Sequence, residues 1–377
     1  VHALKPADVT VVAAIGDSLT AGNGIGSKPN DVLDVLNMYR GLSWSIGGDS
    51  TLDRVTTLPN ILLEFNPLLT GFSTGTGNKT LHNSYLNEAV PGAKALNMAS
   101  QATNLVNKMK ESTVINFNED WKVITIFIGG NDLCQFCHNR DRYSVHKHVS
   151  HIKNTLDILY KEIPRVFVNL VEILEVEGLR RVNANTFGCT LLRPGLCDCI
   201  VVNDHNSLPL ETVKLYNKKY QEMTYQLVET GRYDTKEDFA VVVQPFFEFL
   251  EVPKSPEGVP DRSYMSPDCF HFGEKGHSQS ARALWKNMFE PVGQKTQDQS
   301  LAEDIGIYCP TQIHGSKVTC ADKSPSVSKP TSVHALRPAD VAVVAAIGDS
   351  LTAGNGIASK PNDVLDVLNM YRGLSWR

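Results

Sequence analysis

The chain has 377 residues, of which 42% are hydrophobic and 20% charged, as in ordinary globular proteins. Its formal net charge of −5 gives no support to a nucleic-acid partner, and no apolar run reaches the roughly 18 to 20 residues needed to cross a bilayer. The sequence begins at Val1 without an initiator methionine or a signal peptide, so we expect it to be a piece of a longer protein.

The first predicted strand is followed directly by a serine. Residues 9–15 form a short, continuous apolar run rich in β-branched side chains, which is typical of a buried parallel strand. The motif Gly-Asp-Ser-Leu follows, with its serine at Ser18. These residue types on their own indicate only a turn. However, a serine at the carboxyl end of a central strand occupies the usual place of a functional site in an open α/β sheet.

Strand-like and helix-like segments then alternate. Further buried strands are predicted at residues 122–128, 165–171 and 239–244. A helix is expected at residues 93–109. Apolar residues at three- and four-residue spacing predict two more helices. The first is marked by Val213, Tyr216, Tyr220, Met223 and Leu227, and the second by Ala281, Leu284, Trp285 and Met288. This alternation predicts a three-layer α/β/α sandwich around a central parallel sheet.

The chain contains an internal repeat. Residues 333–377 restate residues 1–45 with only four differences. A period of this size indicates tandem whole domains, so we expect one complete unit over residues 1–300, a linker over 301–332 and a truncated start of the next unit over 333–377.

The second copy carries its own serine, Ser350, but no later catalytic partners. About 45 residues cannot bury a core of their own, so this segment is expected to be disordered or loosely docked. The alternative is that its strand replaces the first strand by domain swapping, which would put Ser350 in the place of Ser18.

The cysteines and one tripeptide favour an oxidising, extracellular location. Their even number and local clustering favour disulfides; the cysteines are Cys134, Cys137, Cys189, Cys197, Cys199, Cys269, Cys309 and Cys320. Eight cysteines allow 105 pairings, which the sequence leaves open, although Cys309 with Cys320 is a plausible near pair. Asn78-Lys-Thr is an N-glycosylation acceptor.

Residues far from Ser18 supply the other groups that ester chemistry needs. A serine hydroxyl becomes a useful nucleophile when a histidine, held by a carboxylate, takes its proton. Asp268 and His271 are three residues apart, so one loop can hold both. Gly92 and Asn131 follow strand-like segments and are candidate donors to a developing oxyanion, together with the Ser18 backbone N–H. His277 is interpreted as a structural residue.

The order of these four stretches resembles the GDSL, or SGNH, hydrolase superfamily over the whole of residues 1–300. The superfamily's blocks match here at Ser18, Gly92, Asn131 and the Asp268–His271 pair. The tandem units, with Asn-Asp-Leu-Cys after the third block and Asp-Cys-Phe-His in the last, are similar to the phospholipase B family.

The resemblance implies an SGNH, flavodoxin-like fold and a calcium-independent esterase without a metal or cofactor. It implies phospholipid and lysophospholipid substrates at a membrane or micelle surface, with activity on glycerides and retinyl esters. It also implies a parent protein on the extracellular, apical face of epithelial cells, with an anchor outside this piece. The alternatives are an esterase for soluble or carbohydrate esters and a non-catalytic binding repeat.

Two patterns resemble cofactor or metal sites. Cys134-x-x-Cys137-His138 fits the string for haem attachment, but its place among many cysteines favours disulfides. His146, His148 and His151 fit a zinc site less well than a solvated helix face, because His146 lies off the face that the other two share.

Overall fold

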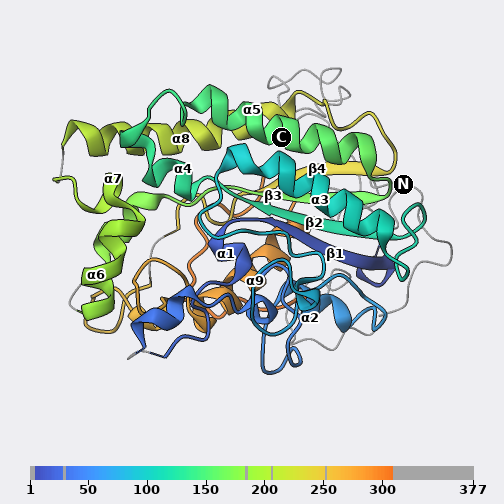
Figure 1. Cartoon of the computed structure of the whole chain (residues 1–377), viewed down its shortest axis with the longest axis horizontal. Helices are drawn as coiled ribbons and strands as arrows, with labels where there is room; N and C mark the ends of the chain where they lie inside the picture. The colour runs from blue at the N-terminus through green and yellow to red at the C-terminus, as the bar shows by residue number, and fades with distance from the viewer. Residues whose placement is uncertain (1–4, 29–30, 183–185, 205–206, 251–252, 309–377) are drawn as a thin grey trace, which may run out of the picture.

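The computed structural model describes residues 5–308 except 29–30, 183–185, 205–206 and 251–252 (Figure 1). Ser350, the second repeat copy and the expected Cys309–Cys320 pair lie outside the described residues. Within them, Leu301, Ile305 and Ile307 are buried in the main core. The division into domains remains a prediction.

The centre of the molecule is a parallel sheet of four strands in the order β1-β2-β3-β4. These are β1 (Val9–Gly16), β2 (Trp121–Phe127), β3 (Val166–Val171) and β4 (Phe239–Gln244). Nearly every side chain of these strands is buried, because both faces of the sheet are covered and the apolar runs are continuous rather than alternating. All four predicted strands are confirmed.

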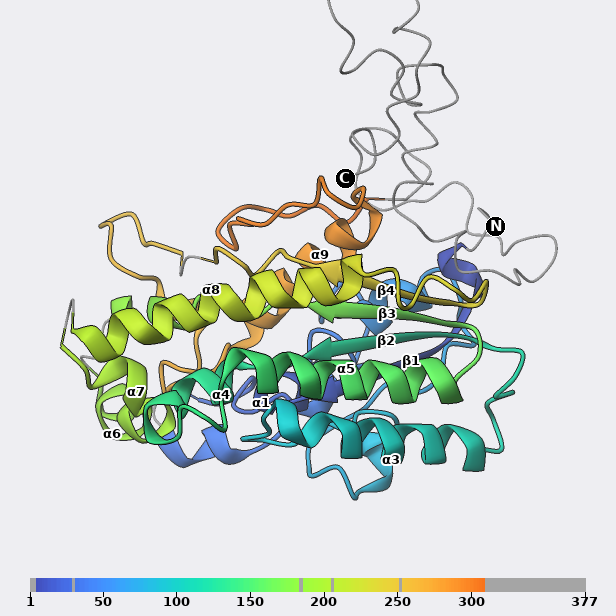
Figure 2. The same cartoon turned by 90° about the horizontal axis from the view of Figure 1, so that it is seen from above.

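Helices cover both faces of the sheet (Figures 1 and 2). One layer contains α3 (Met98–Glu111), α5 (Val145–Glu162) and α8 (Leu208–Glu229), and the opposite layer contains α2 (Leu58–Leu63) and α9 (Glu274–Phe289). The three-layer α/β/α sandwich is thereby confirmed.

The first of the expected helices begins later than predicted. Residues Ala95–Asn97 form the 3-10 turn η5, and the α-helix starts at Met98.

The remaining elements are short. Four short helices are α1 (Ser18–Ala21), α4 (Gly130–Cys134), α6 (Phe187–Leu196) and α7 (Asp198–Val201). The 3-10 turns other than η5 are η1 (Pro6–Asp8), η2 (Val32–Leu36), η3 (Arg40–Leu42), η4 (His82–Ser84), η6 (Phe136–His138), η7 (Val176–Arg181) and η8 (Arg262–Tyr264).

A loop covers the edge of β1 that no strand pairs with. The backbone N–H of Val12 donates to Thr70 O (2.9 Å) and that of Val90 donates to Gly16 O (3.1 Å). The loop therefore runs beside β1 and delivers Gly92 to the end of the sheet where Ser18 lies.

Three disulfides fasten the segment of α6 and α7, residues 187–201, which we call the arm. They join Cys134 to Cys197, Cys137 to Cys199 and Cys189 to Cys269. The preference for disulfides over haem attachment at Cys134 and Cys137 is confirmed.

The histidines of α5 differ from the prediction in one respect. His146 is exposed, but His148 is buried, with only 3% of its surface accessible, and its ring stacks on Tyr220 at a centroid distance of 3.8 Å. The expected solvated face is therefore wrong for His148, because α8 packs over it. Across the described residues, these histidines do not come together as metal ligands.

In the described part of the chain, no helix combines the length and apolar character needed to span a membrane.

Candidate active site

The end of β1 is held rigidly, and this fixes the position of Ser18. The Gln101 side chain receives a hydrogen bond from Gly16 N (2.8 Å) and donates one to Gly16 O (2.9 Å). A Cβ at Gly16 would lie only 2.6 Å from Phe127 O, so a larger residue would push β1 away from β2. Asp17 caps α1 by accepting a hydrogen bond from Leu19 N (3.0 Å), which leaves Ser18 as the first helical residue.

Ser18, His271 and Asp268 form a continuous chain of hydrogen bonds. Ser18 Oγ and His271 Nε2 are 2.8 Å apart, and His271 Nδ1 and Asp268 Oδ2 are 2.6 Å apart. Asp268 is completely buried, while Ser18 and His271 are each 5% accessible. The structure thus brings together three residues that are up to 253 positions apart in the sequence.

The loop that carries Asp268 and His271 is locked at several points. Asp268 Oδ1 accepts hydrogen bonds from the backbone N–H groups of Phe270 and His271, both at 3.0 Å. Ser266 Oγ donates to Gly24 O (2.8 Å) and thereby ties the loop to the chain beyond α1. The Cys189–Cys269 disulfide ties the same loop to the arm. Such locking reduces the freedom of the histidine before substrate arrives.

Asn131 lies beside Ser18 at the start of α4. Its side-chain amide donates to Ala93 O (3.1 Å) and lies 3.4 Å from Asp17 Oδ2. Gly92, the residue before Ala93, is exposed and has a φ of +73°, a conformation that favours glycine. The glycine and asparagine segments therefore meet at the end of β1, although Gly92 does not line the cavity described below.

Burial and nearby charges alter the carboxyl groups of the site. Burial raises the pKa of Asp17 to about 7, against the opposing effects of the Leu19 N–H and of His271. Burial also acts to raise the pKa of Asp268, but His271 and the hydrogen bonds to the carboxylate outweigh it and hold that pKa below its usual range.

His277 is buried next to the site without touching Ser18. Its Nδ1 accepts a hydrogen bond from Trp44 N (3.2 Å). Burial, with a smaller effect from His271, lowers the pKa of His277 to about 3. It is therefore neutral near pH 7, as expected of a structural histidine.

A small apolar cavity of about 40 Å³, the ester cavity, opens at Ser18. Asn131 lies on its polar side. The apolar walls are Leu19, Phe127, Ile173, Leu174, Val176, Leu179, Phe270 and Phe272. A hydrocarbon chain fits such a wall better than a sugar does.

Two contributions to the site were missed in the sequence. The segment after β3, residues 173–179, has no motif, and its four apolar residues were the only available signal. Gln101 is a polar residue on the apolar face of α3. A buried side-chain amide needs hydrogen-bond partners, so its position indicated that it bonds to a nearby backbone.

Comparison with known proteins places this geometry in a family. The model of the family described as GDSL-like Lipase/Acylhydrolase matches residues 12–284. The chain belongs to this family, which makes it a carboxylic ester hydrolase.

Particular relatives are more similar still. The chain is 55% identical over 391 aligned residues to "Phospholipase B1, membrane-associated" of Homo sapiens and 52% identical to the protein of the same name from Rattus norvegicus. Each alignment covers all of this chain but 27% of the relative, so the chain spans about a quarter of the length of these proteins.

A solved structure of the acetylxylan esterase Axe2 from Geobacillus stearothermophilus aligns with this chain at 11% sequence identity and a TM-score of 0.30. The alignment covers 73% of this chain and 91% of the Axe2 chain. That overlap is too weak to bear on fold or function.

Proposed function

We propose that this chain hydrolyses the acyl esters of phospholipids and lysophospholipids, with Ser18 as nucleophile, His271 as general base and Asp268 as the residue that orients His271. The observation that carries the proposal is the buried hydrogen-bond chain of Ser18, His271 and Asp268. The apolar ester cavity and the phospholipase B1 relatives support a lipid substrate. A membrane or micelle surface is the form in which such lipids are presented.

The geometry supports a two-step reaction. Ser18 Oγ attacks the ester carbonyl while its proton passes to His271 Nε2, and Asp268 stabilises the resulting imidazolium. His271 then gives the proton to the departing alcohol oxygen, which leaves an acyl group on Ser18. A water molecule, deprotonated by His271, attacks the acyl-enzyme. The bond between the acyl carbon and Ser18 Oγ breaks, His271 returns the proton to Ser18 Oγ, and the fatty acid is released.

The tetrahedral intermediates carry a negative oxygen that needs donors. We assign this role to the backbone N–H groups of Ser18 and Gly92 and to the Asn131 amide. Asn131 is already oriented at the site by its bond to Ala93 O. Donors fixed before reaction stabilise the transition state without a cost of reorganisation.

The test compares three substrates: long-chain phosphatidylcholine in mixed micelles, a short-chain soluble ester and an acetylated carbohydrate. We expect fatty acid release from the micellar lipid to be fastest and to disappear in Ser18→Ala. Preference for the soluble or carbohydrate ester would contradict the lipid substrate. An absence of hydrolysis of all three would instead indicate a binding module.

The matched control is Ser350→Ala, since the second copy supplies another Gly-Asp-Ser sequence. We expect this variant to retain full activity. Activity that persists in Ser18→Ala and vanishes in the double variant would assign the nucleophile to the second copy.

A further inference from the structure

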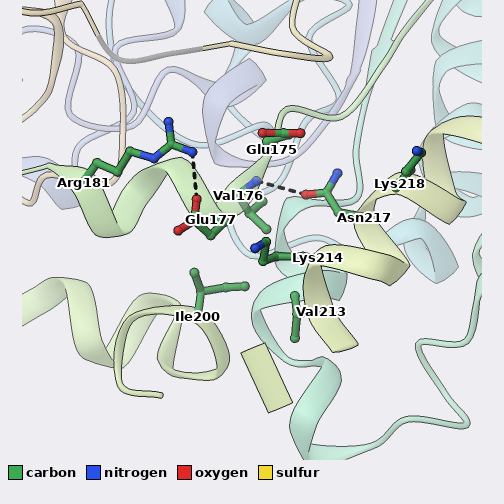
Figure 3. Close-up of a pocket in the computed structure, with 9 residues that line it drawn as sticks. All are labelled: Glu175, Val176, Glu177, Arg181, Ile200, Val213, Lys214, Asn217 and Lys218. Carbon is green, nitrogen blue, oxygen red and sulfur yellow. Dashed lines mark hydrogen bonds and ion pairs between the residues drawn. The ribbon is translucent and has the colours of Figure 1, made fainter. Parts of the chain in front are cut away.

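A second cavity lies against the ester cavity and takes no part in the reaction described above. It has a volume of about 210 Å³, and we call it the side cavity. Val176, in η7, lines both cavities, so the two are adjacent there. Figure 3 shows the residues around it, which come from η7, α7, α8 and the segment before η7.

The side cavity carries both signs of charge. Arg181 pairs with Glu177 at 3.0 Å, and Lys214 pairs with Glu211 on its own helix at 2.9 Å. In the described part of the chain, neither Glu175 nor Lys218 has an ion-pair partner. Both charges act on the partly buried Glu248 carboxyl. Burial raises the pKa of Glu248, the Tyr225 hydrogen bond lowers it, Glu175 raises it and Lys218 lowers it. Glu175 and Lys218 therefore place one charge of each sign at the side cavity.

A buried amide at the same cavity is incompletely bonded. Asn217 is only 3% accessible, and its Oδ1 accepts a hydrogen bond from Val176 N at 3.0 Å. Its Nδ2 has no hydrogen-bond partner among the described residues. Figure 3 shows this nitrogen turned away from the bond to Val176. An unsatisfied buried donor is costly, and a shift of the Asn217 side chain towards a ligand oxygen in the side cavity would remove that cost.

We propose that the side cavity binds the zwitterionic head group of the lipid whose ester is cleaved at Ser18. The phosphate accepts hydrogen bonds from the Asn217 amide and the ammonium groups of Lys218 and Lys214, and the quaternary or primary ammonium of the head group faces Glu175. This inference rests on the proposed function and adds a binding site for the head group, at the side cavity.

The covalent structure of such lipids fits two adjacent cavities. In a glycerophospholipid, the phosphate is only a few bonds from the acyl ester, so both groups can be bound at once. A simple anion matches the side cavity less well, because Glu175 and Glu177 would repel it. The apolar lining of Val176, Ile200 and Val213 suits the glycerol carbons and the methyl groups of choline.

The principal test uses the double variant Lys214→Ala/Lys218→Ala and two substrates with the same acyl chain. Palmitoyl lysophosphatidylcholine carries the head group and monopalmitoylglycerol does not. We expect KM for the lysophospholipid to rise about tenfold, since charge-assisted hydrogen bonds to phosphate are lost. KM for the glyceride is expected to change less than twofold.

The chain offers a matched control in Lys219→Ala. Lys219 follows Lys218 on α8 and is also exposed. It pairs with Glu222 at 2.5 Å and does not line the cavity. We expect it to leave both KM values unchanged. Equal effects of the double variant on both lipids, or the same effect from Lys219→Ala, would overturn the proposal.

A further variant tests the zwitterion itself. Glu175→Gln removes the carboxylate that faces the head-group ammonium. It should reduce the preference for lysophosphatidylcholine over lysophosphatidic acid, which lacks the cation, by about fivefold. An unchanged preference would contradict a site for zwitterions and indicate a site for phosphate alone.

Binding measured without turnover separates this proposal from the proposed function. An ether-linked lysophosphatidylcholine, which cannot be hydrolysed, should bind the parent chain about tenfold more tightly than it binds Lys214→Ala/Lys218→Ala, by titration calorimetry below the micellar concentration. That result supports the side cavity even if no ester is hydrolysed. Equal affinities would overturn it even if Ser18-dependent hydrolysis is observed.

Discussion

The catalytic residues and the arm are stabilised in different ways. Ser18, His271 and Asp268 are buried against the sheet and hydrogen-bonded to each other. The arm has large exposed apolar side chains, with Phe187 73% accessible and Leu191 56% accessible, and is fastened by three disulfides.

The difference shows that packing positions the catalytic atoms, whereas disulfides attach the arm. Catalytic atoms require fixed distances, and a close-packed core with parallel strands provides them. The arm is too short to build a core of its own, so covalent links hold it beside the site. We therefore expect changes near the sheet to alter kcat and changes in the arm to alter stability and KM.

The largest expected effect is that of Ser18→Ala. Loss of the nucleophile should lower kcat by about 10⁴- to 10⁶-fold, as in other serine hydrolases. Circular dichroism and thermal unfolding should remain those of the parent chain, since only one oxygen is removed. A variant with near-normal turnover would show that Ser18 is not the nucleophile.

The next largest effect is expected for Asn131→Ala. Removal of one oxyanion donor typically costs about 10²- to 10³-fold in kcat. Because Asn131 also bonds Ala93 O, we expect a small loss of stability, to be checked by denaturant unfolding. A rise in KM with unchanged kcat would contradict the assigned role.

A change in the arm should give the opposite pattern. Cys137→Ser/Cys199→Ser opens a link between residues 62 positions apart, which should destabilise the protein by about 2–4 kcal/mol. Hydrogen exchange should show faster opening of the arm while β1 stays protected. Turnover should stay within a few-fold of the parent. A loss of kcat as large as that expected for Asn131→Ala would contradict the expectation that changes in the arm leave kcat nearly unchanged.

The smallest expected effect concerns pH and His277. Because the pKa of His277 is about 3 in the folded chain and 6.5 when unperturbed, the unfolded chain binds the extra proton as pH falls below about 6.5. The free energy of unfolding should therefore decrease from pH 6.5 towards pH 4, and less steeply in His277→Gln. Parallel curves for the two proteins, measured by urea unfolding, would contradict this origin.

The sequence predicted the sheet and the position of Ser18 at its edge from local signals, whereas the partners of Ser18 were predicted from the order of distant motifs shared with the GDSL superfamily. Continuous apolar runs identify buried parallel strands, and the end of a strand is where an α/β fold places its site. By contrast, the burial of His148 under Tyr220 depends on how α5 and α8 pack. The disulfide pairing depends on where the arm folds back. The side cavity at Asn217 depends on contacts that no short spacing encodes.

The most direct measurement is mass-spectrometric location of an organophosphonate probe that reacts with activated serines. We predict a single adduct on the peptide that contains Ser18, abolished in His271→Gln, because the hydroxyl reacts only when its proton can pass to His271. The peptides around Ser18 and Ser350 differ in mass, since Thr10 and Gly26 are replaced by Ala342 and Ala358 in the second copy. An adduct on Ser350, or labelling of Ser18 that persists in His271→Gln, would contradict the proposed triad.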